Sequence, residues 1–269
     1  FGVVRIRVIE GYISDWRISG GAYTGDPLLK NILRPVLEQR PLRREVLDRA
    51  FQNLATLPGL NVHPYVRALA DHLGAYELEL HAEQKRFAGG LSVDNHGSEY
   101  IGPVQGVLAL QAFDLTGHHE TYQLKLATTS ETSELHYYDI STEWLIGEKG
   151  TRVQFGEAHT TSKPGSFLKP LDTYIEYDRL RLGVLYPLQR ATNVSTYLGA
   201  ALINYRSRTD LFGVNRLEDR LNSVELSYRH SYRSEEAVNH VIGISLTHGL
   251  KLAGSKVVDT QDGAGIGRP

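Results

Sequence analysis

Two patterns of apolar positions follow one another along this chain. Up to about residue 83, short alternating stretches and helix-like stretches follow each other. From residue 84 onward, apolar and polar residues alternate with a period of two in one long segment after another. That period places successive side chains on opposite faces of a strand, whereas helices repeat about every 3.6 residues. The pattern therefore predicts a small α+β module followed by a large antiparallel β structure.

The small module is predicted to contain two helices. Asp26 suits an N-cap and Pro27 suits the first position of a helix over 26–38, whose last turn Pro35 should kink. A second helix is predicted over 42–57, ending before a proline–glycine pair. The apolar positions of the two helices are Leu28, Leu29, Ile32, Leu33 and Val36, then Leu47, Ala50, Phe51 and Leu54.

Strands are predicted on either side of these helices. They cover 12–19, 60–67 and 74–81, and a further strand is predicted at 1–9, ahead of Gly11. The order over 12–82 is thus strand, helix, helix, strand, strand. Two helices on one face of a three-stranded sheet make a sufficient small core.

The second part of the chain is predicted to contain about nine strands, most of them ~10–15 residues long, which exceeds the usual ~5–6 of globular sheets. One strand alternates Leu180 and Leu182 with Arg179 and Arg181, so that one face is apolar and the other is charged. The strands over 101–113 and 134–146 separate less cleanly, the latter because Asp139 and Glu143 share a face with Leu135 and Tyr137. A soluble β-sandwich or propeller would also alternate in this way.

The links between these strands differ in length. The longer ones are 94–102, 160–172 and 209–219, and they alternate with tight turns at 114–119, 146–150, 186–193 and 232–237. Barrels of the bacterial outer membrane have short periplasmic turns and longer outer loops. If the first strand runs outward, every long link is predicted to lie outside.

Composition narrows the function classes. The 269 residues carry a net charge of −2, which provides no positive field for nucleic acid. The absence of cysteine excludes disulfide frameworks and thiolate metal sites. No apolar run reaches the ~18–20 residues that a membrane helix needs. Because the chain lacks methionine and opens within a predicted strand, we expect it to be a fragment of a longer protein.

Four stretches carry a resemblance to a known family. They are GVVRIRVIEGYISDWRISG at 2–20, RPLRREVLDRAFQNLATLPGLNV at 40–62, FAGGLSVDNHGSEYIGP at 87–103 and LGVLYPLQRATNVSTYLGA at 182–200. In these stretches the chain resembles the outer-membrane transporters of two-partner secretion, the haemolysin-activator type. The first resembles a junction between two POTRA domains, the second a POTRA helix pair, and the third the first barrel strand and hairpin.

The resemblance implies a fold and a location. It implies the last strand of a preceding POTRA domain at 1–11, a complete POTRA domain at 12–83, and the N-terminal part of a transmembrane β-barrel at 84–269. The family's barrel has sixteen strands, so about nine would be present, and the arginine-glycine-tyrosine/phenylalanine tip of its inward-folded loop is not found here. An incomplete barrel would leave an unpaired edge in lipid. We therefore assign the function to an intact parent protein in the cell outer membrane, with its POTRA domain in the periplasm.

That function is the export of a large secreted exoprotein of the haemolysin or adhesin type. The partner would be the N-terminal secretion domain of this exoprotein. Outer-membrane lipid would surround the barrel, and no nucleic acid is expected as a partner. A strand at the edge of the POTRA sheet could pair with the incoming chain. The candidate residues on this edge strand, 60–67, are Asn61, His63, Tyr65 and Arg67. The candidate residues lining the pore are Arg179, Arg181, Glu225 and Arg229.

Two other functions fit the pattern less well. An outer-membrane barrel enzyme, a protease or lipase, would need a histidine–acid set with a nucleophile, and the pairs Asp94/His96 and Glu157/His159 have none evident. A barrel-assembly insertase would usually carry more POTRA domains. Adjacent histidines such as His118 and His119 point to opposite faces of a strand, and a solvated turn is the favoured interpretation there. We therefore expect no catalytic residue, no metal and no cofactor.

Overall fold

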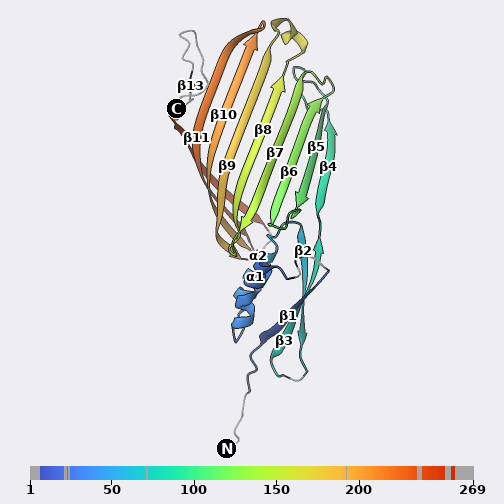
Figure 1. Cartoon of the computed structure of the whole chain (residues 1–269), viewed down its shortest axis with the longest axis vertical. Coiled ribbons are helices and arrows are strands. Elements are labelled where there is room, and N and C mark those ends of the chain that lie inside the picture. Colours follow the sequence, from blue (N-terminus) through green and yellow to red (C-terminus); the bar gives the residue numbers. More distant parts are fainter. Residues whose placement is uncertain are drawn as a thin grey trace, which may run out of the picture.

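The computed structural model describes residues 7–20, 23, 25–70, 72–191, 193–234 and 238–251, and the backbone of 256–257. Figure 1 shows a small α/β domain at one end of a large curved sheet. The strand predicted at 1–9 falls mostly outside the described residues, and its described part, 7–9, lies in no strand.

The small domain contains five elements in the predicted order. They are β1 (Tyr12–Ser19), α1 (Pro27–Glu38), α2 (Arg44–Leu54), β2 (Leu60–Ala68) and β3 (Ala75–Gln84). The three strands form a sheet in the order β1-β3-β2, in which β1 runs parallel to β3 and β2 runs antiparallel to it. As the sequence predicted, β2 lies at the edge.

Local sequence explains where the two helices begin and end. Asp26 caps α1, since its Oδ1 accepts a hydrogen bond from the Leu28 N–H at 2.7 Å, and Pro27 occupies the first turn. The prediction of α2 over 42–57 was too long. At its end the Thr56 N–H and hydroxyl both bond to the Asn53 carbonyl, at 3.1 and 2.7 Å, so a tight turn replaces the last helical turn.

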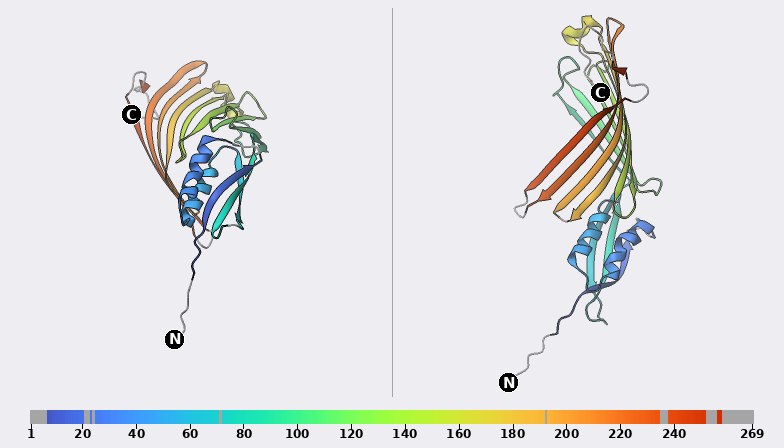
Figure 2. Two further views of the ribbon diagram at one scale, coloured as in Figure 1. Left: turned by 60° about the horizontal axis from the view of Figure 1, so that its bottom comes forward. Right: turned by 90° about the vertical axis from the view of Figure 1, so that its left-hand side faces the viewer.

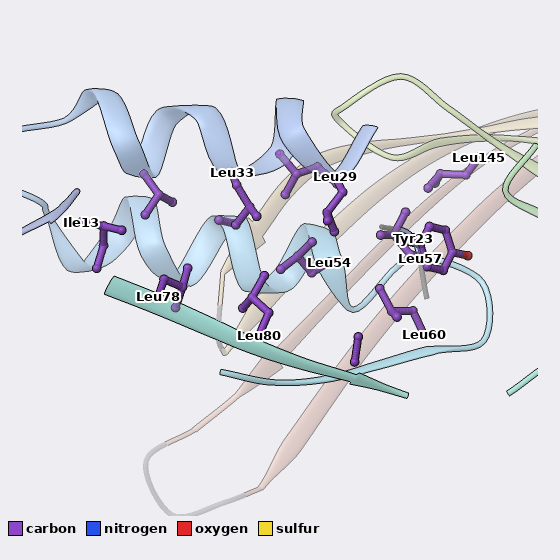
Figure 3. Close-up of a cluster of buried hydrophobic side chains, with 14 residues drawn as sticks. Ile13, Tyr23, Leu29, Leu33, Leu54, Leu57, Leu60, Leu78, Leu80 and Leu145 are labelled. Atoms are coloured by element: carbon purple, nitrogen blue, oxygen red, sulfur yellow. The ribbon is translucent and has the colours of Figure 1, made fainter. Parts of the chain in front are cut away.

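The core of the small domain lies between the helices and the sheet (Figure 3). Its fully buried side chains include Leu29 and Leu33 from α1, Leu54 from α2, and Leu78 and Leu80 from β3. Burial of one such side chain stabilises a fold by about 1.5–3 kcal/mol. One member, Leu145, comes from the large sheet, so the core extends across the boundary between the two parts.

The large sheet is an antiparallel meander in which consecutive strands are neighbours. Its strands are β4 (Phe87–Asp94), β5 (Gln105–Phe113), β6 (Glu120–Thr129), β7 (Leu135–Ile146), β8 (Thr151–Ser162), β9 (Tyr174–Ala191), β10 (Val194–Leu211), β11 (Val214–Arg233) and β12 (Asn239–Leu250). A short strand, β13 (Lys256–Val257), also pairs with β11, and a 3-10 helix, η1 (Ser166–Leu171), lies between β8 and β9. Nine consecutive strands agree with the prediction, although their lengths extend from 8 residues in β4 to 20 in β11.

The strand pairing divides the sheet into two faces of opposite character. One face presents apolar side chains that are 42–68% exposed: Leu180, Leu182, Val184, Leu198, Leu202, Leu226, Ile244 and Leu246. The opposite face carries the charged residues Arg179, Arg181, Glu225 and Arg229. In the described part of the chain β4 pairs only with β5 and β12 only with β11, and Figure 2 shows the sheet curved and open between them. Neither α-helix of the described residues is long and apolar enough to cross a membrane.

One predicted long link does not exist. Residues 209–219 were expected to form a loop, but β10 continues to Leu211 and β11 begins at Val214, so that Phe212 and Gly213 alone make a two-residue turn with φ of 53° and 70°. The polar residues there resemble a loop in sequence, yet they pair across strands, as Arg206 does with Glu218 at 3.5 Å. The tight turn predicted at 186–193 is likewise shorter, because β9 extends to Ala191.

Candidate protein-binding edge and channel wall

Among the described residues, the edge strand β2 pairs with β3 alone, which leaves its other side open. Two hydrogen bonds just beyond its ends fix which residues face β3. The Lys85 N–H donates to the Gly59 carbonyl at 2.8 Å and the Leu69 N–H donates to the Ala75 carbonyl at 3.0 Å. Because bonding alternates along an antiparallel ladder, the odd-numbered residues of β2 bond to β3. The even-numbered residues direct their backbone groups to the open side.

Proline occupies the centre of this open side. Pro64 is even-numbered and has no N–H, which is why it does not disrupt the ladder with β3. Val62 and Val66 direct N–H donors outward on either side of it, while the Leu60 N–H already donates to the Leu57 carbonyl at 3.2 Å. A proline within a strand is a recognisable sign of an edge, so Pro64 is a signal in the sequence that could have identified β2 as an edge strand.

The four predicted edge residues share one exposed face of the small sheet. Asn61 Nδ2 lies 3.1 Å from His63 Nε2, the Tyr65 ring packs edge-on against His81, and Arg67 pairs with Glu79 at 2.8 Å. Val62, on the opposite face, packs against the core. The structure therefore brings Asn61, His63, Tyr65 and Arg67 together beside the open edge, but the outward backbone groups belong to the residues between them.

The four predicted pore residues lie on the polar face of the large sheet. Arg181 reaches across β10 to Glu225 on β11 at 2.9 Å, and Arg179 reaches across β8 to Asp139 on β7 at 3.3 Å. Ion pairs that reach over an intervening strand are expected where a sheet is concave. Arg229 lines the same face beside a cavity of about 620 Å³, whose other polar lining residues include Arg152, Gln154, Arg181 and Glu225.

Acidic residues complete this polar face. Asp139 and Glu143 weakened the strand pattern at 134–146, and the structure gives them a place: Asp139 binds Arg179, and Glu143 binds Arg152 at 3.1 Å and Gln154 at 2.7 Å. Partly exposed pairs of this kind stabilise a fold by only about 0–1 kcal/mol each. Their consequence is that this face is polar and carries charges of both signs.

A buried polar junction joins the small domain to the turn between β5 and β6. His119 Nε2 lies 3.4 Å from Asp26 Oδ2, and its ring stacks on Tyr23 with centroids 5.6 Å apart. The Tyr23 hydroxyl donates to the Pro58 carbonyl at 2.9 Å. Burial, and then the negative charge of nearby Asp114, raise the pKa of Tyr23 above its ordinary value. The interpretation of this turn as solvated was wrong for His119, whose side chain is 15% exposed.

A histidine and two carboxylates meet on the apolar side of the large sheet. His159 Nδ1 lies 2.6 Å from Asp178 Oδ1, and a Glu176 oxygen lies within 4.8 Å of both ligand-type atoms. Glu157, which the sequence placed beside His159, instead accepts a hydrogen bond from the Tyr138 hydroxyl at 3.3 Å. The neighbouring strand supplies the acids, which spacing within β8 could not predict.

A βααββ domain followed by a long antiparallel meander is also the fold of several solved structures. The structure is similar to CdiB from Escherichia coli (TM-score 0.72, 16% identity, covering 94% of this chain and 47% of that one). It is also similar to CdiB from Acinetobacter baumannii (TM-score 0.62, 13% identity, 89% and 46%). BamA from Haemophilus ducreyi, in a structure lacking POTRA domains 1–3, matches with a TM-score of 0.52 and 12% identity (92% and 49%).

These likenesses confirm, for the fold, the resemblance carried by the sequence. The chain spans about half the length of each of these structures. No protein-family model matches it, and no curated protein matches its sequence.

Proposed function

We propose that the intact parent protein exports a secreted exoprotein across the outer membrane, with no catalytic role. The observation that carries this proposal is the placement of an open-edged domain at one end of a sheet whose two faces are apolar and polar. Residues 12–83 would be a periplasmic POTRA domain, and residues from 84 onward part of a membrane barrel. The strand order β1-β3-β2 with two helices on one face supports that assignment.

The apolar face supports a position in the outer membrane. A membrane barrel presents apolar residues to lipid and polar residues to its lumen in strict alternation. Leu182, Leu202 and Leu226 are about half exposed, which costs free energy in water and none in hydrocarbon. The domain would then lie on the periplasmic side, next to the short turns.

Capture would use the backbone of β2. An unfolded polypeptide has unpaired N–H and C=O groups, and an open edge can pair with them while demanding little of the sequence. Val62 and Val66 offer the outward donors, and each bond contributes about 0.5–1.5 kcal/mol. Asn61, His63, Tyr65 and Arg67 would contact side chains of the same segment. Because each hydrogen bond is weak, the captured polypeptide can be released from β2 again.

The polar face would serve as the channel wall. Arg179, Arg181, Glu225 and Arg229 keep the wall hydrated and offer no apolar surface on which an unfolded chain could adhere. The pairing of most of these charges limits attraction to a passing segment of either sign.

Barrel assembly is the second candidate, and the likeness to BamA favours it. The TM-score with that structure is 0.52, against 0.72 with CdiB from Escherichia coli, and for this reason we prefer export.

Substitutions in the edge strand β2 test the proposal. Val66→Pro in the full-length parent removes one outward N–H without touching the β3 ladder, as Pro64 already does. We expect about three- to tenfold weaker binding of the N-terminal domain of the exoprotein encoded beside the parent gene, and reduced secretion. Val66→Ala keeps the N–H and serves as the matched control, and Tyr65→Ala tests the side chain alone.

Normal binding and secretion by a folded Val66→Pro variant, and by Val62→Pro, would exclude capture at this edge. Abolition of secretion by deletion of the parent remains the test of export itself. If deletion instead impairs assembly of other barrels and leaves the exoprotein secreted, the second candidate is correct.

A further inference from the structure

A basic cavity lies between the small domain and the large sheet. It has a volume of about 270 Å³ and is lined by Arg49 and Asn53 of α2, Lys149 of the β7–β8 turn, and the end of β9 including Arg190. None of the described residues that line it is acidic. Among the described residues, no ion pair joins Arg49, Lys149 or Arg190 to an acid, whereas Glu148, next to Lys149, is paired with Arg34.

The guanidinium of Arg190 also lacks an acidic partner among the described residues. Its Nη2 donates to the Gly150 carbonyl at 3.2 Å and its plane lies over the Tyr197 ring, 5.5 Å from the centroid. Its Nε and Nη1 are buried and have no hydrogen-bond partner in the described structure. A buried cation without a counter-charge is costly, so an anion held in the cavity would offset that cost.

The cavity and an apolar groove share one lining residue. Tyr186 lines the cavity and also lines a groove of about 450 Å³ on the apolar face, together with Val184, Leu198, Leu226 and Leu246. Leu188, at the mouth of the cavity, is 53% exposed. A ligand that fits both parts has an anionic head and a hydrocarbon tail.

We propose that this cavity binds the head group of an anionic glycerophospholipid, whose acyl chains lie in the groove. The inference rests on the proposed position of the sheet in the outer membrane, in which the cavity is level with the head groups of the periplasmic leaflet. Arginine and lysine are the side chains that bind phosphate best. Since a lipid tail gains little by exchanging bilayer for protein, the selectivity comes from the head group.

The bound lipid would also hold the two parts of the chain together. Its phosphate is positioned to contact α2 through Arg49, the β7–β8 turn through Lys149 and β9 through Arg190. An anionic head group between these elements fixes the orientation of the small domain relative to the channel mouth. A neutral lipid leaves three like charges facing one another there.

The test uses the full-length parent, purified in detergent and offered phosphatidylglycerol and phosphatidylcholine in equal amounts. We expect it to retain phosphatidylglycerol preferentially, measured by native mass spectrometry. The variant Arg49→Gln/Lys149→Gln removes two exposed charges that make no ion pair with described residues, and should bind phosphatidylglycerol about tenfold more weakly. Lys163→Gln/Lys169→Gln, in the β8–β9 link at the other end of β8 from Lys149, makes the same change in net charge and should bind like wild type.

Three results would overturn the proposal: equal retention of both lipids, equal loss in the two double variants, or complete displacement of phosphatidylglycerol by millimolar inorganic phosphate or by hexaglutamate. Displacement by hexaglutamate would assign the cavity to an acidic segment of a passing polypeptide. Heat-dependent gel migration of each variant confirms that its barrel is closed. No exoprotein is present in this experiment. A negative result for lipid binding therefore does not contradict the export proposal, and a negative result for export does not change the expected lipid retention.

Discussion

At the level of single residues, Tyr23 connects three segments that are distant in sequence. Its ring stacks on His119 in the turn between β5 and β6, and its hydroxyl donates to the carbonyl of Pro58, which follows α2. Because the ring is buried, water cannot take the place of the hydroxyl as the donor to the Pro58 carbonyl unless the surrounding residues rearrange. We expect the junction to depend on this one hydroxyl.

Tyr23→Phe should destabilise the small domain by about 1–3 kcal/mol, because it leaves a buried carbonyl without its donor. Faster hydrogen exchange in α1 and α2 of the full-length protein would report the loss. Tyr65→Phe is the control, since that ring is 58% exposed. Unchanged exchange in Tyr23→Phe would show that the hydroxyl is dispensable.

The same residue predicts a pH dependence. Its pKa is raised in the folded protein, chiefly by burial, so the folded state retains a proton that the unfolded chain releases above about pH 10. Stability from this group is therefore complete below that pH and declines as the pH rises further. Tyr23→Phe should decline less steeply than wild type between pH 10 and 11. Parallel curves would contradict the raised pKa.

At the level of elements, prediction from sequence succeeded where the determinants are local. Asp26 and Pro27 mark the start of α1, and the period of two marks β4 to β12, because each pattern depends on near neighbours. It failed where long-range pairing decides. The turn at 212–213 is short because β10 and β11 pair along their whole length, and a local pattern of charges does not reveal that.

The candidate sites divide in the same way. The face of Arg179, Arg181, Glu225 and Arg229 follows from alternation alone. The direction of the backbone groups of β2 depends on the pairing with β3, and the contact of His119 with Asp26 joins two separate domains. Neither could be obtained from spacing along the chain.

The direction of the strands gives a prediction about the two sides of the membrane. Single cysteines at Ser166 and Gln189 occupy exposed positions at opposite ends of the sheet, in a chain without other cysteines. On whole cells an impermeant maleimide should label position 166 and not 189, and permeabilised cells should label both. Labelling of 189 alone on intact cells would reverse the topology.

For the whole molecule, the two-faced sheet predicts how the intact parent behaves in the cell. It should fractionate with the outer membrane, and it should migrate differently on gels before and after heating, because a closed barrel resists detergent until it is heated. The exposed apolar face described above is the physical reason. Recovery of the parent as a soluble monomer without detergent would contradict a membrane barrel.

Leu145 belongs to the β7–β8 hairpin, yet it packs into the core of a domain that is synthesised earlier, and its N–H donates to the His119 carbonyl at 3.1 Å. The core of the small domain therefore lacks Leu145 until that hairpin has formed. Before then Tyr23 and Leu57 would remain partly exposed to solvent, and the helices would be less tightly packed. If the parent exports proteins as proposed, its small domain would be fully packed only when the β7–β8 hairpin is in place, so that capture of a partner would not precede formation of these strands.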